Sequence, residues 1–158
     1  MMKKSPANSA YDENFERKRA FEKEILLNRA ENSARIFESA RARQVIEHTK
    51  EHYGDVLEFL WIDTPNAAVL RHKENKKWYA VFMAINARKL GLRNDDTISI
   101  VNVKAKPEFI DESVDNAHFF RAYHMNKRHW LTIKLDESMD FKAVCELIDE
   151  SWRITRKK

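Results

Sequence analysis

Glycine occurs at only two of the 158 positions, Gly54 and Gly91, which lie far apart in the chain. A Walker phosphate loop, a dinucleotide fingerprint and a nucleophile elbow each need at least two glycines within a few residues. None of these three motifs can be formed here. The sequence therefore argues against most nucleotide-using enzyme classes and against hydrolases with such an elbow.

The length predicts one domain that can bury a core without disulfides. Hydrophobic residues make up 43% of the chain and charged residues 34%, which is typical of a globular protein with a charged surface. Cys145 is the only cysteine, so no internal disulfide can form, and we expect a cytoplasmic protein. No apolar run approaches the roughly 20 residues that span a bilayer, and we expect no membrane partner.

The N-terminal third of the chain is rich in charge and predicts helices. Residues 1–10 are polar, and we expect them to be disordered. From residue 11 to residue 53 there is neither proline nor glycine, and apolar positions recur at helical spacing in two different phases. This pattern predicts two helices with a break near Asn32–Ser33, where Asn or Ser caps the second helix and Gly54 ends it. We assign residues 11–40 to a helical extension that could contact a protein partner or a second copy.

The rest of the chain, residues 41–158, predicts one α+β domain. Apolar runs bounded by turn residues predict strands at 57–62, 67–72, 77–85, 97–105 and 130–136. Short helical segments are expected at 86–92 and 107–114, and a last helix carries the apolar stripe Phe141, Val144, Cys145, Ile148 and Trp152. We therefore expect a single antiparallel sheet of about five strands with helices packed on one face.

Three stretches, "LWIDTPNAAVLRHKENKKWYAVFMAI", "ISIVNVKAKPEFID" and "FRAYHMNKRHWLTIKLD", resemble the MmcQ/YjbR family of small bacterial proteins. The most specific part is the family pattern H-[ML]-N-K-x-H-W followed by a strand that ends in Leu-Asp. It is matched here by His124, Met125, Asn126, Lys127, His129, Trp130, Leu135 and Asp136. The resemblance covers roughly residues 42–155.

This resemblance implies a fold like that of CyaY and frataxin, also described as a double wing, and a DNA-binding role without catalysis. Two departures from the family pattern stand out. Glu137 takes the place of a glycine that many members have after Leu-Asp, and the helical segment 11–40 is longer than the family's minimal core.

Cationic side chains are concentrated in two stretches that the resemblance would place on DNA. The net charge is only +4, but residues 117–135 contain no acidic residue, and "RHKENKK" at 71–77 surrounds a predicted hairpin turn. Lys and Arg meet phosphates, Asn can bridge to a base edge or the backbone, and exposed rings stack on bases. The candidate nucleic-acid contacts are Arg71, Lys73, Lys76, Lys77, Arg121, His124, Asn126, Lys127, Arg128, His129 and Lys134.

A purely structural interpretation of the same residues stays open. Asn126 is at home in a turn, the histidines can bond to backbone carbonyls, and Trp130 fits the core better than a stacking platform. The cations of 71–77 can equally form a hydrated turn. In that case the chain is a module that binds a protein or a small ligand.

Metal binding and catalysis find little support in the sequence. The spacing of His124 and His129 is not a common metal-ligand spacing, and Cys145 lies in an apolar stripe. No serine or cysteine nucleophile can be paired with His129 on sequence grounds. We expect no metal, no cofactor and no catalytic residue.

Overall fold

The computed structural model describes residues 14, 16–19, 35–61 and 63–156. Five strands form one antiparallel sheet in the order β1-β2-β3-β5-β4. Their bounds are β1 Ala67–Arg71, β2 Trp78–Asn86, β3 Thr97–Lys104, β4 Phe119–Arg121 and β5 Trp130–Lys134. The helical elements are η1 Arg35–Glu38, α2 Ala40–Tyr53, η2 Ala87–Leu90, α3 Pro107–Ser113 and α4 Phe141–Arg156. The predicted α+β class is confirmed.

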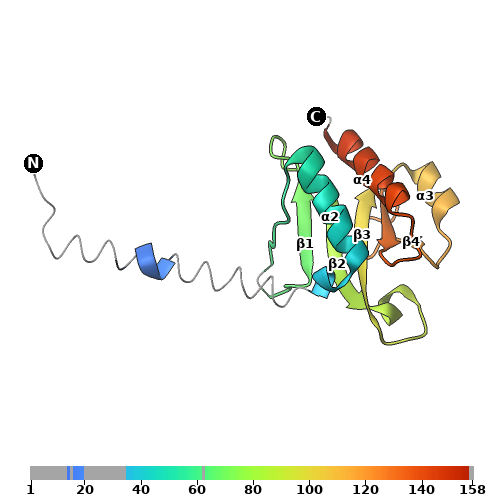
Figure 1. The fold of residues 1–158 in the computed structure, drawn as a ribbon. Coiled ribbons are helices and arrows are strands. Elements are labelled where there is room, and N and C mark those ends of the chain that lie inside the picture. Colours follow the sequence, from blue (N-terminus) through green and yellow to red (C-terminus); the bar gives the residue numbers. More distant parts are fainter. Residues whose placement is uncertain (1–13, 15, 20–34, 62, 157–158) are drawn as a thin grey trace, which may run out of the picture.

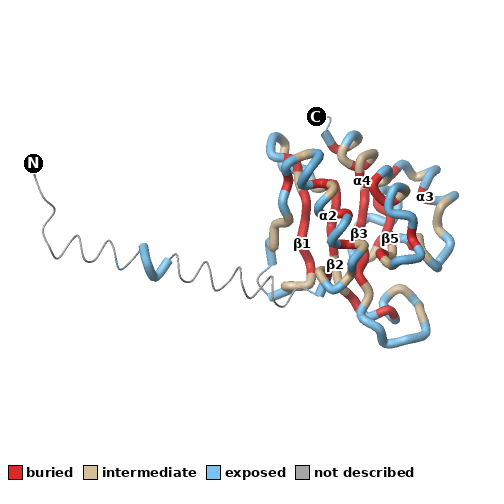
Figure 2. The backbone as a smooth tube through the Cα atoms, viewed as in Figure 1, coloured by how far each residue is buried: buried red, intermediate tan, exposed pale blue. Residues whose placement is uncertain are grey.

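The helices α2 and α4 lie side by side over one face of the sheet (Figure 1). That face is apolar because alternate strand residues point toward it, among them Leu70, Phe82 and Leu131, which are fully buried. Val45 of α2 and Ile148 of α4 pack into the same core cluster. The buried positions follow the middle of the strands and the inner sides of both helices (Figure 2). Burial of this shared apolar surface is the main stabilising contribution to the fold.

Both ends of α2 are capped by local chemistry. Ser39 is the N-cap, and its hydroxyl accepts from the Ala42 N–H at 3.0 Å and donates to the Leu135 carbonyl at 3.1 Å. The predicted start of this helix near Asn32–Ser33 is therefore wrong, since a serine cap that also bonds to the core domain begins the helix at Ala40. Gly54 ends it in the left-handed conformation, as predicted, with φ of 71°.

The predicted strand 57–62 is wrong. Only Glu58 pairs with β1, through a single antiparallel bridge to Val69. Pairing goes no further because the next N–H on that edge, at Ala67, donates instead to the Thr64 carbonyl in the turn before β1. The segment therefore lies along the outer edge of the sheet, with Leu60 and Trp61 exposed.

The remaining predicted strands and the last helix are confirmed, and β4 is an addition. It has only three residues and pairs with β5 through Phe119, Phe120 and Arg121. So short a strand has no alternating pattern that a sequence window could detect. It restores the strand number to five after the loss of 57–62.

The predicted disorder of residues 1–10 and most of the predicted extension 11–40 lie outside the described residues. Within the described part, Ile36 of η1 is fully buried in the core cluster, and the Arg35 N–H donates to Asn66 Oδ1 at 2.8 Å. No helix in the described ranges is long and apolar enough to cross a membrane.

Asp115 organises the turn that leads into β4. Its Oδ1 accepts from the backbone N–H groups of Ala117, His118 and Phe119, each at 2.9 Å. These hydrogen bonds lower the pKa of the Asp115 carboxyl to about 2. The carboxylate therefore stabilises the fold above its ordinary pKa of 3.8, and this contribution is lost as the pH falls through about 2.

We expect Asp115→Ala to lower the free energy of unfolding at pH 7 by about 1 kcal/mol, because three N–H groups lose their charged acceptor. The difference from the native chain should shrink between pH 4 and pH 2 in urea titrations followed by circular dichroism. Glu112→Gln, at an exposed carboxylate outside this turn, is the control. A difference that stays constant down to pH 2 would contradict the assignment.

Candidate nucleic-acid interface

The two cationic stretches lie at the same end of the sheet. β1 and β2 are joined by the hairpin turn 72–77, and β4 and β5 are joined by the loop 122–129. Because all neighbouring strands are antiparallel, the last residues of β1, β3 and β4 point to one end. We call this the hairpin end; Arg71, Lys104 and Arg121 complete their strands there.

The last turns of α4 connect the hairpin turn to the rest of this end. Asn75 Nδ2 donates to the Thr155 carbonyl at 3.1 Å, and the Lys104 N–H donates to Ser151 Oγ at 2.9 Å. The Ala105 N–H then donates to the His129 carbonyl at 3.0 Å. Hydrogen bonds thus connect the hairpin turn, α4, the end of β3 and the 122–129 loop at this end of the sheet.

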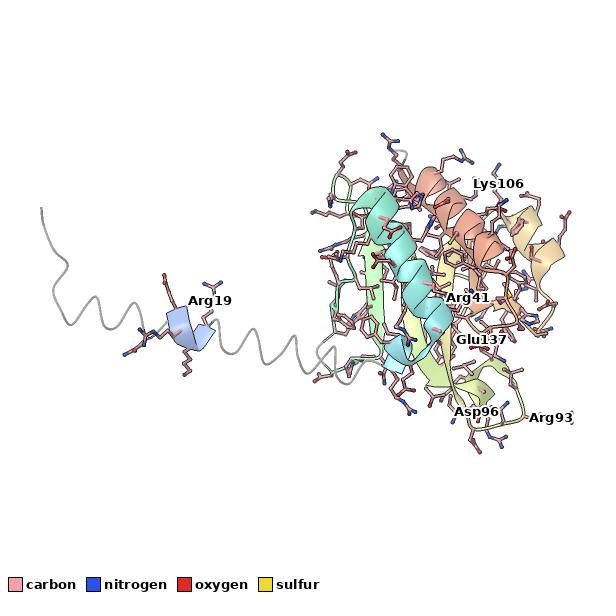
Figure 3. All side chains as sticks on the ribbon, viewed as in Figure 1. Arg19, Arg41, Arg93, Asp96, Lys106 and Glu137 are labelled. Carbon is pink, nitrogen blue, oxygen red and sulfur yellow. The ribbon has the colours of Figure 1, made fainter. Side chains whose placement is uncertain are left out.

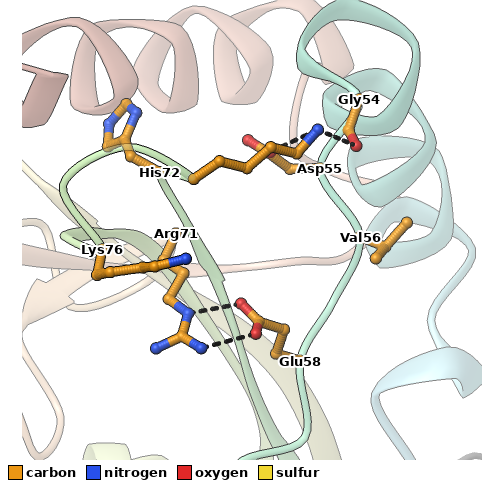
Figure 4. A pocket seen from close by; sticks show the side chains of 8 residues that line it. Gly54, Asp55, Val56, Glu58, Arg71, His72 and Lys76 are labelled. Carbon is orange, nitrogen blue, oxygen red and sulfur yellow. Dashed lines mark hydrogen bonds and ion pairs between the residues drawn. The ribbon is translucent and has the colours of Figure 1, made fainter.

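Several hairpin cations lie against acceptors of the chain itself (Figure 4). The Arg71 guanidinium makes a two-pronged ion pair with Glu58, with N–O distances of 2.8 and 2.9 Å. Lys73 Nζ donates to the Gly54 carbonyl at 3.3 Å and lies 3.9 Å from Asp55 Oδ1. The Glu58 pair neutralises Arg71, so it is a weaker phosphate ligand than its sequence position suggests.

Lys76 extends from the hairpin turn toward the segment that carries Val56 and Glu58 (Figure 4). Together with Arg71 and Lys73 it lines a cavity of about 220 Å³ between the hairpin turn and residues 54–58. Lys77, the next hairpin cation, begins the return toward β2 and is exposed. The hairpin turn therefore contributes three ammonium groups, at 73, 76 and 77, to the hairpin end.

Buried polar groups hold the hairpin turn in place. The Tyr79 hydroxyl donates to Asp55 Oδ2 at 2.6 Å, and His72 Nε2 lies 2.8 Å from Thr155 Oγ1. Burial lowers the pKa of His72, so its ring is neutral at pH 7. His72 is therefore a structural link between the hairpin turn and α4 and adds no charge to the surface.

The 122–129 loop is fastened to the sheet by a buried network. Thr132 Oγ1 accepts from the Tyr123 N–H at 2.9 Å and donates to Asn102 Oδ1, while Asn102 Nδ2 donates to the Tyr123 carbonyl at 3.2 Å. Asn102 and Thr132 are fully buried. The backbone of Tyr123 is thus held at both its N–H and its carbonyl, which fixes where the loop leaves β4.

Two polar residues of the loop stabilise the loop itself. Asn126 Oδ1 accepts from the N–H groups of Arg128 and His129, at 2.9 and 3.2 Å, which is the side-chain turn expected for asparagine. Lys127 Nζ donates to the Ala122 carbonyl at 2.7 Å. The Asn126 side chain therefore shapes the loop, as the structural interpretation expects. Lys127 is exposed, but its ammonium group also bonds to the loop backbone.

Other side chains of the loop point outward. His124, Arg128 and His129 are exposed, and within the described residues Arg128 and His129 make no side-chain hydrogen bond or ion pair. His124 adopts φ of 59° and its ring contacts Tyr123, with centroids 4.1 Å apart. Trp130 is buried, as predicted.

Two of the candidate residues are placed differently. Arg121 reaches the hairpin end, but its guanidinium faces the helices and pairs with Asp111 of α3 at 2.8 Å. Lys134 lies at the opposite end of β5 and pairs with Asp136 at 3.4 Å. Neither side chain therefore adds a free cation to the hairpin end.

Sequence reasoning missed four cations that the fold adds to this end: Lys104, Lys106, Arg153 and Arg156. Lys104 Nζ lies 6.0 Å from the Trp130 ring centroid, and the Arg156 guanidinium lies 5.1 Å from that of Trp152. The carboxylates of the same end include Asp55, Glu58, Glu74, Glu108, Asp111 and Glu150. Three of them form ion pairs with cations of this end: Glu58 with Arg71, Asp111 with Arg121 and Glu150 with Arg153. The cations outnumber these carboxylates, so positive charge prevails. Lys106 lies at this end and Asp96 at the other (Figure 3).

The described residues bring no metal cluster of three or more His, Cys, Asp or Glu together. Burial raises the pKa of the Cys145 thiol to about 11, so at neutral pH it is protonated rather than a nucleophilic thiolate.

A small antiparallel sheet covered by helices on one face, with cationic loops gathered at one end, defines the class of this protein. The family model for YjbR matches residues 50–154. The chain therefore belongs to the YjbR family, which confirms the resemblance carried by "HMNKRHW".

Relatives agree in sequence and in fold. The chain is 37% identical over 112 residues to the uncharacterised protein YyaQ of Bacillus subtilis, an alignment that covers 71% of this chain and 95% of YyaQ. A crystal structure of a Pseudomonas syringae protein is 34% identical, with a TM-score of 0.69, over 72% of this chain and 97% of that one. A Deinococcus radiodurans structure, 22% identical with a TM-score of 0.53 over 73% and 76% of the two chains, shares the fold.

We expect Thr132→Val to lower the free energy of unfolding by about 1–3 kcal/mol, because Asn102 would lose a buried hydrogen-bond partner. Urea titration followed by tryptophan fluorescence measures this. Thr97→Val makes the same chemical change at an exposed strand position and should have a much smaller effect. Equal effects of the two substitutions would show that the network does not hold the loop.

Proposed function

We propose that this protein binds nucleic acid, DNA in the first instance, through the hairpin end and without catalysing a reaction. The observation that carries the proposal is the convergence of cations from four separate segments on one end of the sheet. The hairpin turn supplies Lys73, Lys76 and Lys77, and the 122–129 loop supplies Lys127 and Arg128. The end of β3 adds Lys104 and the last turn of α4 adds Arg156, whereas Glu150 already holds Arg153 in an ion pair.

Convergence matters because a phosphate backbone is a line of negative charges that one isolated cation holds poorly. Several lysines and arginines along one surface release counterions together, and this release is the main source of affinity for nucleic acid. The rigid anchors at Asn102, Thr132 and His72 keep the two loops in fixed positions. A surface organised before binding loses less conformational entropy on binding.

The candidate contacts are not equivalent. Lys76 and Arg128 are the strongest candidates, since Arg71 and Arg121 already hold carboxylates and Lys134 lies at the other end of the sheet. Asn126 acts through the shape of the loop. We place this binding in the cytoplasm, because a single buried thiol suits a reducing compartment.

We expect the native chain to bind a labelled DNA oligonucleotide in a fluorescence anisotropy titration, with affinity that falls steeply as salt rises. Lys76→Glu with Arg128→Glu should weaken binding about tenfold or more at moderate salt. The slope of the logarithm of the binding constant against the logarithm of the salt concentration should also become shallower, by about one for each lost phosphate contact.

The matched control is Lys89→Glu with Arg93→Glu, which makes the same charge change in the exposed region around η2 and the following loop at the opposite end of the sheet. It keeps the net charge of the two variants equal. If both pairs weaken binding equally, the attraction comes from overall charge rather than from the hairpin end. Absence of salt-dependent binding by the native chain would refute the proposed function.

A further inference from the structure

The face of the sheet opposite the helices carries an apolar groove of about 240 Å³. It lies over β1 and β2 and is bordered by the segment before β1 and by the 122–129 loop. Its main lining residues are Trp61, Trp78, Val81, Met83, His124 and Met125. The segment before β1 and the loop thus form opposite borders of the groove.

The floor of the groove is apolar because this face has a second, smaller buried cluster that includes Val69, Val81 and Trp130. No described helix covers it, since α2 and α4 both lie on the other face (Figure 1). The Trp61 and Trp78 rings meet edge to face, with centroids 5.6 Å apart and planes at 90°. Trp61 is 38% exposed, so one large ring remains accessible beside the groove.

Two of the segments that line this groove continue along the chain into the cationic loops. Trp78 comes directly after Lys76 and Lys77 of the hairpin turn, and His124 and Met125 belong to the same loop as Lys127 and Arg128. The apolar groove is therefore lined in part by residues that directly follow or belong to the two loops that the proposed function assigns to phosphates. A ligand that fits both features is apolar and planar in one part and anionic in the next.

We propose that the groove accepts an unpaired base of single-stranded nucleic acid, which stacks against Trp61 while its flanking phosphates meet the two cationic loops. This inference rests on the proposed function and specifies its substrate class. Base stacking on an aromatic ring beside a cationic track is the physical basis of single-strand binding. A duplex cannot use the groove without first unstacking a base.

The experiment compares one labelled oligonucleotide as a single strand and as a duplex, by anisotropy and by quenching of tryptophan fluorescence. The native chain should bind the single strand more tightly, and the single strand alone should quench the fluorescence. Trp61→Ala should weaken single-strand binding by about 5- to 100-fold, the range that one stacked base contributes. It should leave duplex affinity unchanged.

Two further variants keep the test decisive. Trp61→Phe retains a ring that can stack on a base and should recover most of the single-strand affinity. Phe141→Ala removes an aromatic ring of similar exposure on the helix side and should change neither affinity. Thermal unfolding of each variant establishes that it is folded.

The outcomes separate the two proposals. Salt-dependent binding that is equal for single strand and duplex, with no effect of Trp61→Ala, overturns the base-stacking inference and leaves the proposed function standing. Absence of salt-dependent binding to either form overturns both. Preference for the single strand that survives Trp61→Ala also overturns the inference, because the preference then comes from elsewhere.

Discussion

The hydrogen bonds among Asn102, Thr132 and the backbone of Tyr123 are the interaction on which the candidate interface depends. The side chains of Asn102 and Thr132 are buried, so a polar group that lost its partner in this network would destabilise the fold. Asn102 lies on β3 and Thr132 on β5, and their bonds reach the chain just after β4. One network therefore joins three neighbouring strands and fixes the start of the loop that carries Arg128 and one border of the groove.

The strand order supplies the other half of the arrangement. Because β1, β3 and β4 all finish at the same end, turns that are far apart in the sequence present their cations together. The opposite end receives the turn after β2 and the turn after β5, where Asp96 and Glu137 lie at the same end as the cations Arg93 and Arg41 (Figure 3). The hairpin end thus gathers an excess of cations in a chain of modest net charge, and it is the distribution rather than the sum that matters for a polyanion.

Much of the fold could be predicted because alternation and turn residues are local signals. The strands β2 and β3, the helix α4 and the cap at Gly54 all follow from windows of a few residues. The prediction of a strand at 57–62 was wrong although the segment has the apolar pattern of a strand. Ala67 uses its N–H in a turn, so this edge offers no partner for further pairing. β4 was missed because three residues make no pattern.

The candidate site was less predictable, because ion pairs and neighbouring strands are set by the tertiary structure and not by local sequence patterns. Arg71 and Arg121 cannot be told from Arg128 in the sequence, yet each forms an ion pair, with the carboxylates of residues 58 and 111 respectively. The groove brings residues 61 and 124 together, and no rule of sequence spacing relates these two positions.

The measurement that tests the account most directly is an amide chemical-shift titration of the native chain with a DNA oligonucleotide. The account predicts that shifts concentrate in 73–77, 104–106 and 124–129; shifts confined to the outer surfaces of α2 and α4, or to residues 88–96, would contradict it.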